Sequence, residues 1–281
     1  MTDSYISLYQ NSNWSSLDPS DFLTLMFLFL GRMTPIIVLV PFFGAKMLPG
    51  AVKIVLALSL FVVLLPQLLF VAEKPIHFDF NATIYLFKEI FIGLLIGFML
   101  SLPFFIVQTA GMLIDNQRGG SSLMINDPTM QNQSSPLGTL FNLVLIYLFF
   151  RIDGPFTVIE IVSTSYTALP PDKLLSGEIF HADSPIYNSI THILGHVMIL
   201  GTQMATPALI MILMTDFFLG IANRLAPQVQ ISFLGMPLKS LLALVVVFFG
   251  WSLFNEESLF QVRRALQNVA LYVHQLIPTN P

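Results

Sequence analysis

The stretch "IFIGLLIGFMLSLPFFIVQTAGMLI", residues 90–114, is a run of 25 residues without a single charged side chain. It exceeds the roughly 20 apolar residues that an α-helix needs to cross the hydrocarbon core of a bilayer. Within it, Gly93 and Gly97 form a GxxxG pair, which lets two helix backbones approach closely, although chance composition is the alternative explanation. The stretch therefore predicts an apolar helix that packs tightly against another helix.

The composition of the whole chain matches this stretch. Hydrophobic residues make up 55% of the 281 residues, 26 residues are Phe, and only 10% are charged, which lies outside the range of soluble domains. Cysteine is absent, so disulfides, thiolate metal sites and a cysteine nucleophile are excluded. The net charge is -4 and the twelve basic residues are spread thinly, so no nucleic-acid partner is expected. The first twenty residues lack Lys and Arg, so we expect no cleavable signal peptide.

The expected fold class is all-α, a membrane-associated bundle of broken, proline-kinked apolar helices, in a single domain over residues 1–281. Arg32 and Lys239 fall inside apolar segments, where a charge costs on the order of 3 kcal/mol, so they are expected to face protein or water. The predicted apolar helical units are 22–45, 54–72, 84–114, 136–150, 190–222 and 231–255. The prolines expected to kink or break them are Pro35, Pro41, Pro66, Pro103, Pro207 and Pro237.

A different pattern begins near the C-terminus. Asn255 is predicted to cap an amphipathic helix over residues 256–277, whose first turn carries Glu256 and Glu257 near the positive end of the helix dipole. Apolar residues recur at spacings of three and four on one face of this helix. We expect it to dock on the chain's own bundle, with a partner subunit or a lipid surface as the alternatives.

A long polar segment, residues 115–136, follows the opening stretch directly. It is rich in Asn, Gln, Ser and Gly, and its charges are limited to Asp115, Arg118 and Asp127. Met124 and Met130 add flexible side chains that can repack against changing surfaces. Uncharged amides and hydroxyls allow a passing polypeptide to exchange hydrogen bonds without being held. These properties favour a gate or gasket in a channel, and an ordinary surface loop is the alternative.

Several ordered blocks resemble the SctT/FliR family of export-apparatus proteins of type III secretion and flagellar assembly. The most specific block is "NRLAPQVQISFLGMPLKS" (223–240). The others are "GMLIDNQRGGSS" (111–122), "NDP" (126–128), "SSPLGTLF" (134–141), "DGPF" (153–156) and "STSYTALP" (163–170). The resemblance implies one such chain assembling with several SctR-like and SctS-like subunits into an export gate in the bacterial inner membrane. It also implies an SctU-like switch protein and an SctV-like export gate on the cytoplasmic side, unfolded protein substrates, and contact with membrane lipid.

The same resemblance implies that a loop matching residues 115–122 plugs the closed pore, with Arg118 as the anchoring charge and Gly119 and Gly120 as hinges. The family's methionine gasket belongs to the SctR-like partner, so a sealing role for methionines of this chain is an extension from their chemistry. The predicted gate residues are Asp115, Gln117, Arg118, Gly119, Gly120, Ser121, Met124 and Met130. The residues expected to serve assembly are Arg224, Pro227, Gln228, Pro237 and Lys239.

Other chemistry is weaker in the sequence. His192 and His196 lie four residues apart, as zinc ligands on one helical face do, but no third ligand is evident. Asp216 and Glu89 adjoin long apolar runs, a pattern typical of ion pathways or of partnered charges within a complex. No enzyme, cofactor or metal site is therefore expected. The competing functions are a self-contained secondary transporter, an intramembrane enzyme using the histidine pair, and the flagellar counterpart of the secretion gate.

Overall fold

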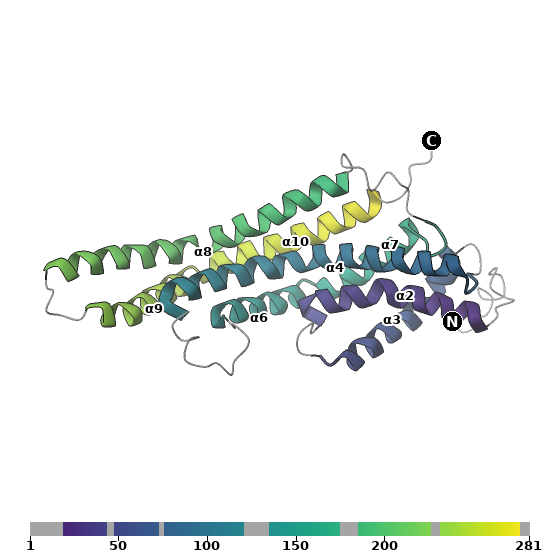
Figure 1. The fold of residues 1–281 in the computed structure, drawn as a ribbon, viewed down its shortest axis with the longest axis horizontal. Coiled ribbons are helices and arrows are strands. Elements are labelled where there is room, and N and C mark those ends of the chain that lie inside the picture. The colour runs from purple at the N-terminus through teal and green to yellow at the C-terminus, as the bar shows by residue number, and fades with distance from the viewer. Residues whose placement is uncertain are drawn as a thin grey trace. The chain divides into compact units, whose positions relative to one another are not determined.

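The computed structural model describes residues 19–43, 48–72, 76–120, 135–174, 185–225 and 231–275, and within these ranges the regular structure is helical, without strands (Figure 1). The all-α prediction is confirmed. The elements are α2 (Pro19–Leu39), η1 (Pro41–Phe43), α3 (Gly50–Val71), α4 (Phe80–Asp115), η2 (Asn116–Gly120), α6 (Pro136–Arg151), α7 (Gly154–Ala168), α8 (Pro185–Leu225), α9 (Ile231–Phe249) and α10 (Trp251–Gln275).

The chain divides into two compact units. Unit 1 contains residues 1–101, 153–189 and 264–281, and unit 2 contains residues 102–152 and 190–263. Because α4, α8 and α10 each contribute residues to both, the division follows packing rather than helix boundaries.

The core of unit 1 forms where α2 packs beside α3, a pair that Figure 1 shows side by side. On α2, buried apolar residues recur every three or four positions, at Leu25, Phe29, Met33 and Ile36, which is the period of one helix face. The ring of Phe29 lies 5.6 Å from that of Tyr166 in α7, in a stacked arrangement. Aromatic contact thus joins α7 to the α2–α3 pair.

The GxxxG pair of α4 provides the closest packing in unit 1. A Cβ atom built on Gly93 would lie 2.2 Å from the carbonyl oxygen of Arg32, and one on Gly97 would lie 3.0 Å from Cα of Ile36. Side chains at these positions would collide with the backbone of α2. The predicted close approach of two helices is confirmed, with α2 as the partner of α4.

In unit 2, α6 packs against residues 102–115 of α4 and against the first part of α10. Phe104 of α4 meets Phe149 of α6 with ring centroids 6.0 Å apart, and Phe141 of α6 meets Phe254 of α10 at 4.2 Å. These rings come from segments far apart in the sequence and form the core of unit 2. The polar segment connects two of its helices, α4 and α6.

Prolines interrupt the helices less than the sequence suggests. Five of the six lie inside helices that continue through them: Pro35, Pro66, Pro103, Pro207 and Pro237. Only Pro41 marks a helix end, because α2 stops at Leu39, two residues before it. A bend of 65° occurs instead at Gly250, between Gly235–Phe249 and Trp251–Val273.

Within the described residues each of the six predicted apolar units contains a helix, although the α-helix of the first unit ends at Leu39 and the units do not all have the length of a single span. Among the described residues, four helices are long and apolar enough to cross a membrane, at Pro19–Leu39, Gly50–Val71, Phe80–Gly119 and Gly195–Leu225. The bent pair at Gly250 gives a fifth if counted as one span, and Pro136–Arg151 is a shorter apolar helix.

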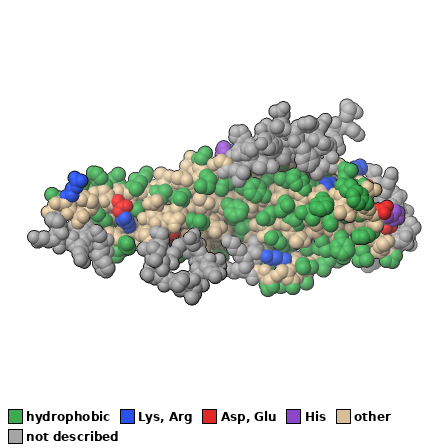
Figure 2. Space-filling view, viewed as in Figure 1, with side chains coloured by type: hydrophobic (Ala, Val, Ile, Leu, Met, Phe, Trp, Pro, Cys, Tyr) green, Lys and Arg blue, Asp and Glu red, His purple; other side chains and the backbone are tan. Residues whose placement is uncertain are grey.

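Large apolar side chains also cover much of the face seen in Figure 2, with few charges between them. On α3 alone, Val55, Val62, Val63 and Phe70 are each more than 60% exposed. Surface of this kind is normally covered by lipid or by other protein chains.

Two local predictions were wrong. The C-terminal helix begins at Trp251 rather than after Asn255, whose side chain lies within the helix and therefore cannot cap its start. Helix α7 was not among the predicted units, because its Ser, Thr and Glu residues mask the apolar face formed by Val158, Ile161 and Val162.

Candidate functional site at the base of the polar segment

The polar segment starts with a change of helix type. Helix α4 ends at Asp115, and residues 116–120 form the π-helical turn η2, in which Gly119 adopts φ 100°, ψ 14°. A positive φ of this size is strained for residues with a side chain and readily adopted by glycine. Position 119 is therefore where the chain turns out of the helix, and the hinge role of Gly119 stays a prediction.

A single buried carboxylate joins the two ends of the polar segment. Asp115 is 1% exposed, and its Oδ1 accepts hydrogen bonds from Nε and Nη2 of Arg118, both at 2.7 Å. Its Oδ2 accepts from the Ser135 hydroxyl at 2.5 Å and from the backbone N–H of Leu137 at 2.9 Å. Residues 116–134 thus leave and return at one side chain. We call this arrangement the Asp115 clamp.

The far side of the clamp is the start of α6. Ser135 is the N-cap residue, because its hydroxyl oxygen accepts from the backbone N–H of Gly138 at 2.9 Å. The Asp115 carboxylate lies against the same helix end, where exposed N–H groups and the helix dipole favour negative charge. The chemistry of this helix start explains why an aspartate can be buried here.

Close backbone packing between α4 and α6 holds the two sides of the clamp together. A Cβ atom built on Gly111 would lie 2.3 Å from the backbone nitrogen and 2.4 Å from Cα of Gly138. The three atoms nearest to a Cβ at Gly111 are backbone atoms of Leu137 and Gly138, so the separation of α4 and α6 at this crossing is fixed within narrow limits. The carboxylate one turn later is consequently held at a constant distance from the start of α6.

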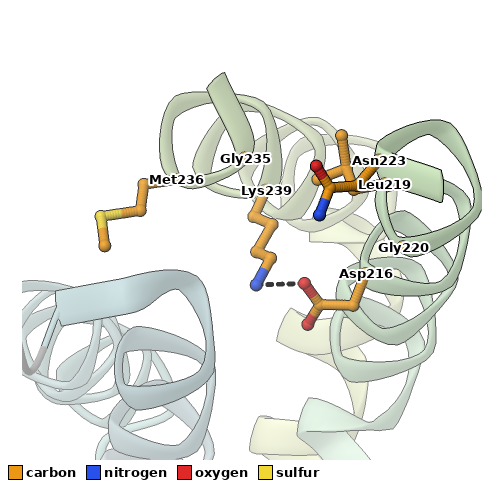
Figure 3. Close-up of a pocket in the computed structure, with 7 residues that line it drawn as sticks. All are labelled: Asp216, Leu219, Gly220, Asn223, Gly235, Met236 and Lys239. Atoms are coloured by element: carbon orange, nitrogen blue, oxygen red, sulfur yellow. Dashed lines mark ion pairs between the residues drawn. The ribbon is translucent and has the colours of Figure 1, made fainter. Parts of the chain in front are cut away.

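Arg118 extends the site to a third helix. Its Nη1 donates a hydrogen bond to the hydroxyl of Ser240 in α9 at 3.1 Å, and its side chain is 18% exposed. The preceding residue of α9, Lys239, forms an ion pair with Asp216 of α8 (Figure 3). The base of the polar segment is therefore connected to α9 and, through α9, to α8.

The structure places part of the predicted gate. Asp115 and Arg118 meet in the clamp, Gly119 follows them on η2, Gln117 is exposed on η2, and Gly120 ends that turn. Ser121, Met124 and Met130 lie outside the described residues. Neither the opening nor the sealing of a pore is tested by these positions, so the gating roles stay predictions.

Of the residues expected to serve assembly, Arg224 is exposed near the end of α8, and Pro237 lies within α9 beside Lys239. Pro227 and Gln228 fall outside the described residues. The ion pair gives Asp216 and Lys239 partners within the chain. The sequence had left the role of Asp216 open.

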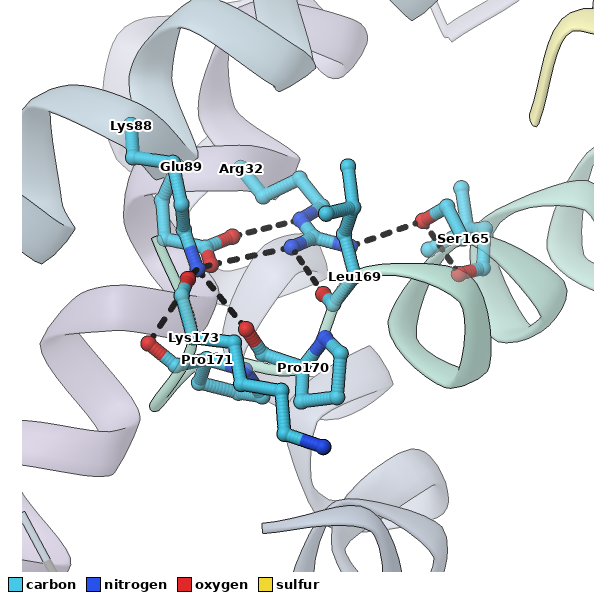
Figure 4. A network of polar contacts seen from close by, with 9 residues as sticks. Arg32, Lys88, Glu89, Ser165, Leu169, Pro170, Pro171 and Lys173 are labelled. Carbon is cyan, nitrogen blue, oxygen red and sulfur yellow. Dashed lines mark hydrogen bonds and ion pairs between the residues drawn. The ribbon is translucent and has the colours of Figure 1, made fainter. Parts of the chain in front are cut away.

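Unit 1 contains a second polar cluster, which is fully buried (Figure 4). Glu89 accepts hydrogen bonds from Nε of Arg32 at 2.5 Å and from Nη2 at 2.9 Å, and its other contact is the ammonium of Lys88 at 2.9 Å. Arg32 also stacks on the ring of Tyr166, 3.9 Å from its centroid. Partnered charge, one of the two interpretations of Glu89, describes this arrangement.

The two cations of this cluster reach the segment that follows α7. Lys88 donates to the carbonyl oxygens of Pro170, Pro171 and Lys173 at 2.8, 3.2 and 2.9 Å, and Arg32 donates to that of Leu169 at 2.9 Å. The cluster therefore fastens residues 169–173 to α2 and α4. Burial also raises the pKa of Tyr166 above its ordinary value, so its hydroxyl stays neutral.

The histidine pair gains no support as a zinc site. His196 is exposed on α8, and the side chain of His192 lies outside the described part of the chain. Among the described residues, no group of three or more His, Cys, Asp or Glu side chains is arranged to hold a metal ion.

Comparison with known proteins places these features in a family. Residues 23–264 match the family described as Bacterial export proteins, family 1. The chain is 31% identical to Yop proteins translocation protein T of Yersinia pestis over 221 residues, which cover 77% of this chain and 81% of that protein. Surface presentation of antigens protein SpaR of Shigella flexneri is 35% identical over 166 residues, 58% of this chain and 60% of that protein. Flagellar biosynthetic protein FliR of Escherichia coli (strain K12) is 27% identical over 216 residues, 77% of this chain and 80% of that protein.

Proposed function

The chain belongs to the family of bacterial export proteins, family 1, and on that premise we propose that it is a gate-forming subunit of a type III protein export apparatus. It resides in the bacterial inner membrane as a multi-pass protein, consistent with its apolar helices. Its cargo is unfolded protein, which crosses through a conduit that this subunit helps to form and close.

The observation that carries the gating role is the Asp115 clamp. A polar, weakly charged segment leaves and re-enters the structure at one buried carboxylate. With both ends fixed and Gly119 at the turn, the segment between them can change position while α4 and α6 stay packed. In this proposal residues 116–134 close the conduit and Arg118 anchors the closed form. Met124 and Met130 seal against the surface that lines the conduit.

The subunit works within an assembly. The names of the relatives refer to protein translocation, antigen presentation and flagellar biosynthesis, and in this proposal export by this chain requires the other subunits of its apparatus. We assign the neighbouring positions to SctR-like and SctS-like subunits, an SctU-like switch protein and an SctV-like export gate. The exposed apolar surface of helices such as α3 supplies area for such partners or for lipid. The subunit forms and breaks no covalent bond, and energy for export comes from elsewhere in the machine.

Shortening the polar segment tests the gate directly. Deletion of residues 121–133 leaves the Asp115 clamp and η2 in place, so the complex should assemble and leak ions or small molecules across the inner membrane. A matched control replaces the same residues with a Gly/Ser sequence of equal length. Conductance of the purified complex in planar bilayers gives the readout. An assembled complex with the deletion and unchanged conductance would contradict the gating role.

Two charge reversals distinguish an anchoring role of Arg118 from a general effect of changing the charge of the chain. Arg118→Glu places a second carboxylate against Asp115 and removes the bond to Ser240, so closure should be disturbed. Lys173→Glu changes an exposed side chain of unit 1 by the same charge and should disturb closure less. Equal leakage from both variants would argue against an anchoring role for Arg118.

We assign the chain to an injection system because the wording of its sequence blocks is closer to SctT than to FliR. Identity does not separate the two, since the relatives named for translocation, secretion or antigen presentation are 24–35% identical to this chain and the FliR proteins are 27–28% identical. The flagellar counterpart is the second candidate, since the match to FliR covers 80% of that protein. Neighbouring genes distinguish the two. Copurification of the tagged chain in mild detergent should yield small, apolar SctR-like and SctS-like proteins, whereas a stable monomer that transports a small solute alone would support the secondary-transporter alternative.

A further inference from the structure

Helix α9 makes polar contacts in two directions through adjacent residues of unit 2. Ser240 accepts the hydrogen bond of Arg118 from η2, at 3.1 Å, and Lys239 pairs with Asp216 of α8. Successive residues of an α-helix point about 100° apart, so one turn of α9 serves both neighbours. Figure 3 shows the Lys239 side chain extending from α9 to the carboxylate of Asp216.

Among the described residues, little apolar packing joins α8 to α9 beside this ion pair. A cavity of about 300 Å³ opens here, lined in part by Gly220, Asn223 and Gly235. A Cβ atom built on Gly220 would meet nothing within 4 Å, and one on Gly235 would meet only Cδ1 of Leu219, at 3.2 Å. Since few of the described side chains interlock at this level, we take the ion pair to be the main contact that sets the position of α9 on α8.

We propose that Asp216 and Lys239 are positioning residues for the gate, which hold α9 on α8 so that Ser240 meets Arg118 at the base of the polar segment. The pair acts through Ser240, which is next to Lys239 in α9. This inference rests on the proposed gating function of residues 115–136. It gives Lys239 a role inside the subunit, in place of the assembly role that the sequence suggested.

The exposure of the two side chains makes the contact adjustable. Asp216 is 45% exposed and Lys239 is 22% exposed, so water and ions reach the pair. A partially solvated ion pair is weaker and more readily exchanged than a buried one. The cavity beside it leaves room for α9 to shift when the pair opens, and such a shift would withdraw Ser240 from Arg118.

Charge exchange in the complete export complex tests the pair. Lys239→Met should raise the fraction of time that the purified complex conducts by roughly fivefold or more, the effect of losing about one net hydrogen bond. The double variant Asp216→Lys/Lys239→Asp should restore closure, because it recreates the ion pair with its ends reversed. Arg263→Met, which removes an exposed positive charge from α10, is the control and should conduct like the wild type.

A second comparison asks whether the pair acts through Ser240. Ser240→Ala should leak by itself, and Lys239→Met/Ser240→Ala should leak no more than the leakier single variant. Independent, multiplicative effects would overturn the inference. Failure of the charge exchange to restore closure would also overturn it. If Lys239→Met prevents assembly, the exchanged pair should restore assembly, and its failure to do so would overturn the inference as well.

The deletion of residues 121–133 is measured alongside these variants. If the deletion leaks and the pair variants do not, the inference fails and the gating function stands. If the deletion does not leak in an assembled complex, the proposed function itself fails.

Discussion

Replacing Glu89 by Gln should destabilise unit 1 more than any other single change in its buried cluster. The carboxylate has no exposed surface and serves two cations, with Arg32 donors at 2.5 and 2.9 Å and the Lys88 ammonium at 2.9 Å. Gln keeps the shape, removes the charge and turns an N–H₂ group toward these donors. Two buried cations then repel one another without an anion between them.

The size of the effect follows from the burial of the two cations. Removing one partner from a buried ion pair costs about 3–5 kcal/mol. For a protein of this length each kcal/mol lowers the unfolding temperature by about 2–4 °C, so a fall of roughly 10 °C is expected. Arg32→Met should have a smaller effect, because the pair of Lys88 with Glu89 remains.

The measurement is thermal unfolding of the purified export complex in mild detergent, together with the amount of each variant in membranes. Glu89→Asp provides a matched control that keeps the charge and shortens the reach. The reasoning is refuted if Glu89→Gln unfolds within about 2 °C of the wild type. It is also refuted if Arg32→Met is the more damaging change, since the shared anion would then not be the centre of the cluster.

Three further changes test other contacts. Gly111→Ala puts a methyl group into the backbone of Gly138 and should cost about 1–3 kcal/mol, measured as a lower unfolding temperature of the complex. Ser135→Ala removes the cap of α6 and a donor to Asp115, so we expect a loss of about 1–2 kcal/mol with increased leakage; unchanged values in both assays would contradict the clamp. Lys88→Met frees three carbonyl groups after α7 and should make that segment more sensitive to limited proteolysis, with wild-type protection as the contrary result.

The sequence predicts well those features that depend on local pattern. Gly93 and Gly97 indicated a close helix contact because small residues at a spacing of four leave one face of a helix flat, and α2 occupies that face. Where they are described, the six apolar units are largely helical, because a segment in a bilayer must satisfy its own backbone hydrogen bonds. The resemblance of ordered sequence blocks identified the family that the comparisons show.

Other features depend on contacts between distant positions and left no local signal. Arg32 meets Glu89 from 57 residues away and the carbonyl of Leu169 from 137 residues away. The sequence showed only that these charges needed partners. Ser135 read as part of a polar run, although it caps α6 and joins Asp115 across 20 residues. The prolines predicted more helix breaks than the structure has. Neighbouring helices can satisfy the backbone groups that a proline leaves without a partner, so five of the six prolines lie inside continuous helices.

The Asp115 clamp also bears on protein engineering. Because one side chain ties the entry and exit of residues 116–134 together, the distance between the two ends is independent of how many residues connect them. Doubling the number of residues in a loop adds only about 0.6 kcal/mol to the entropic cost of holding its two ends together. An epitope, a fluorophore site or a foreign sequence inserted between η2 and Ser135 should therefore leave the packing of the helices unchanged. Variants with insertions of different length can then be compared in the same helical structure.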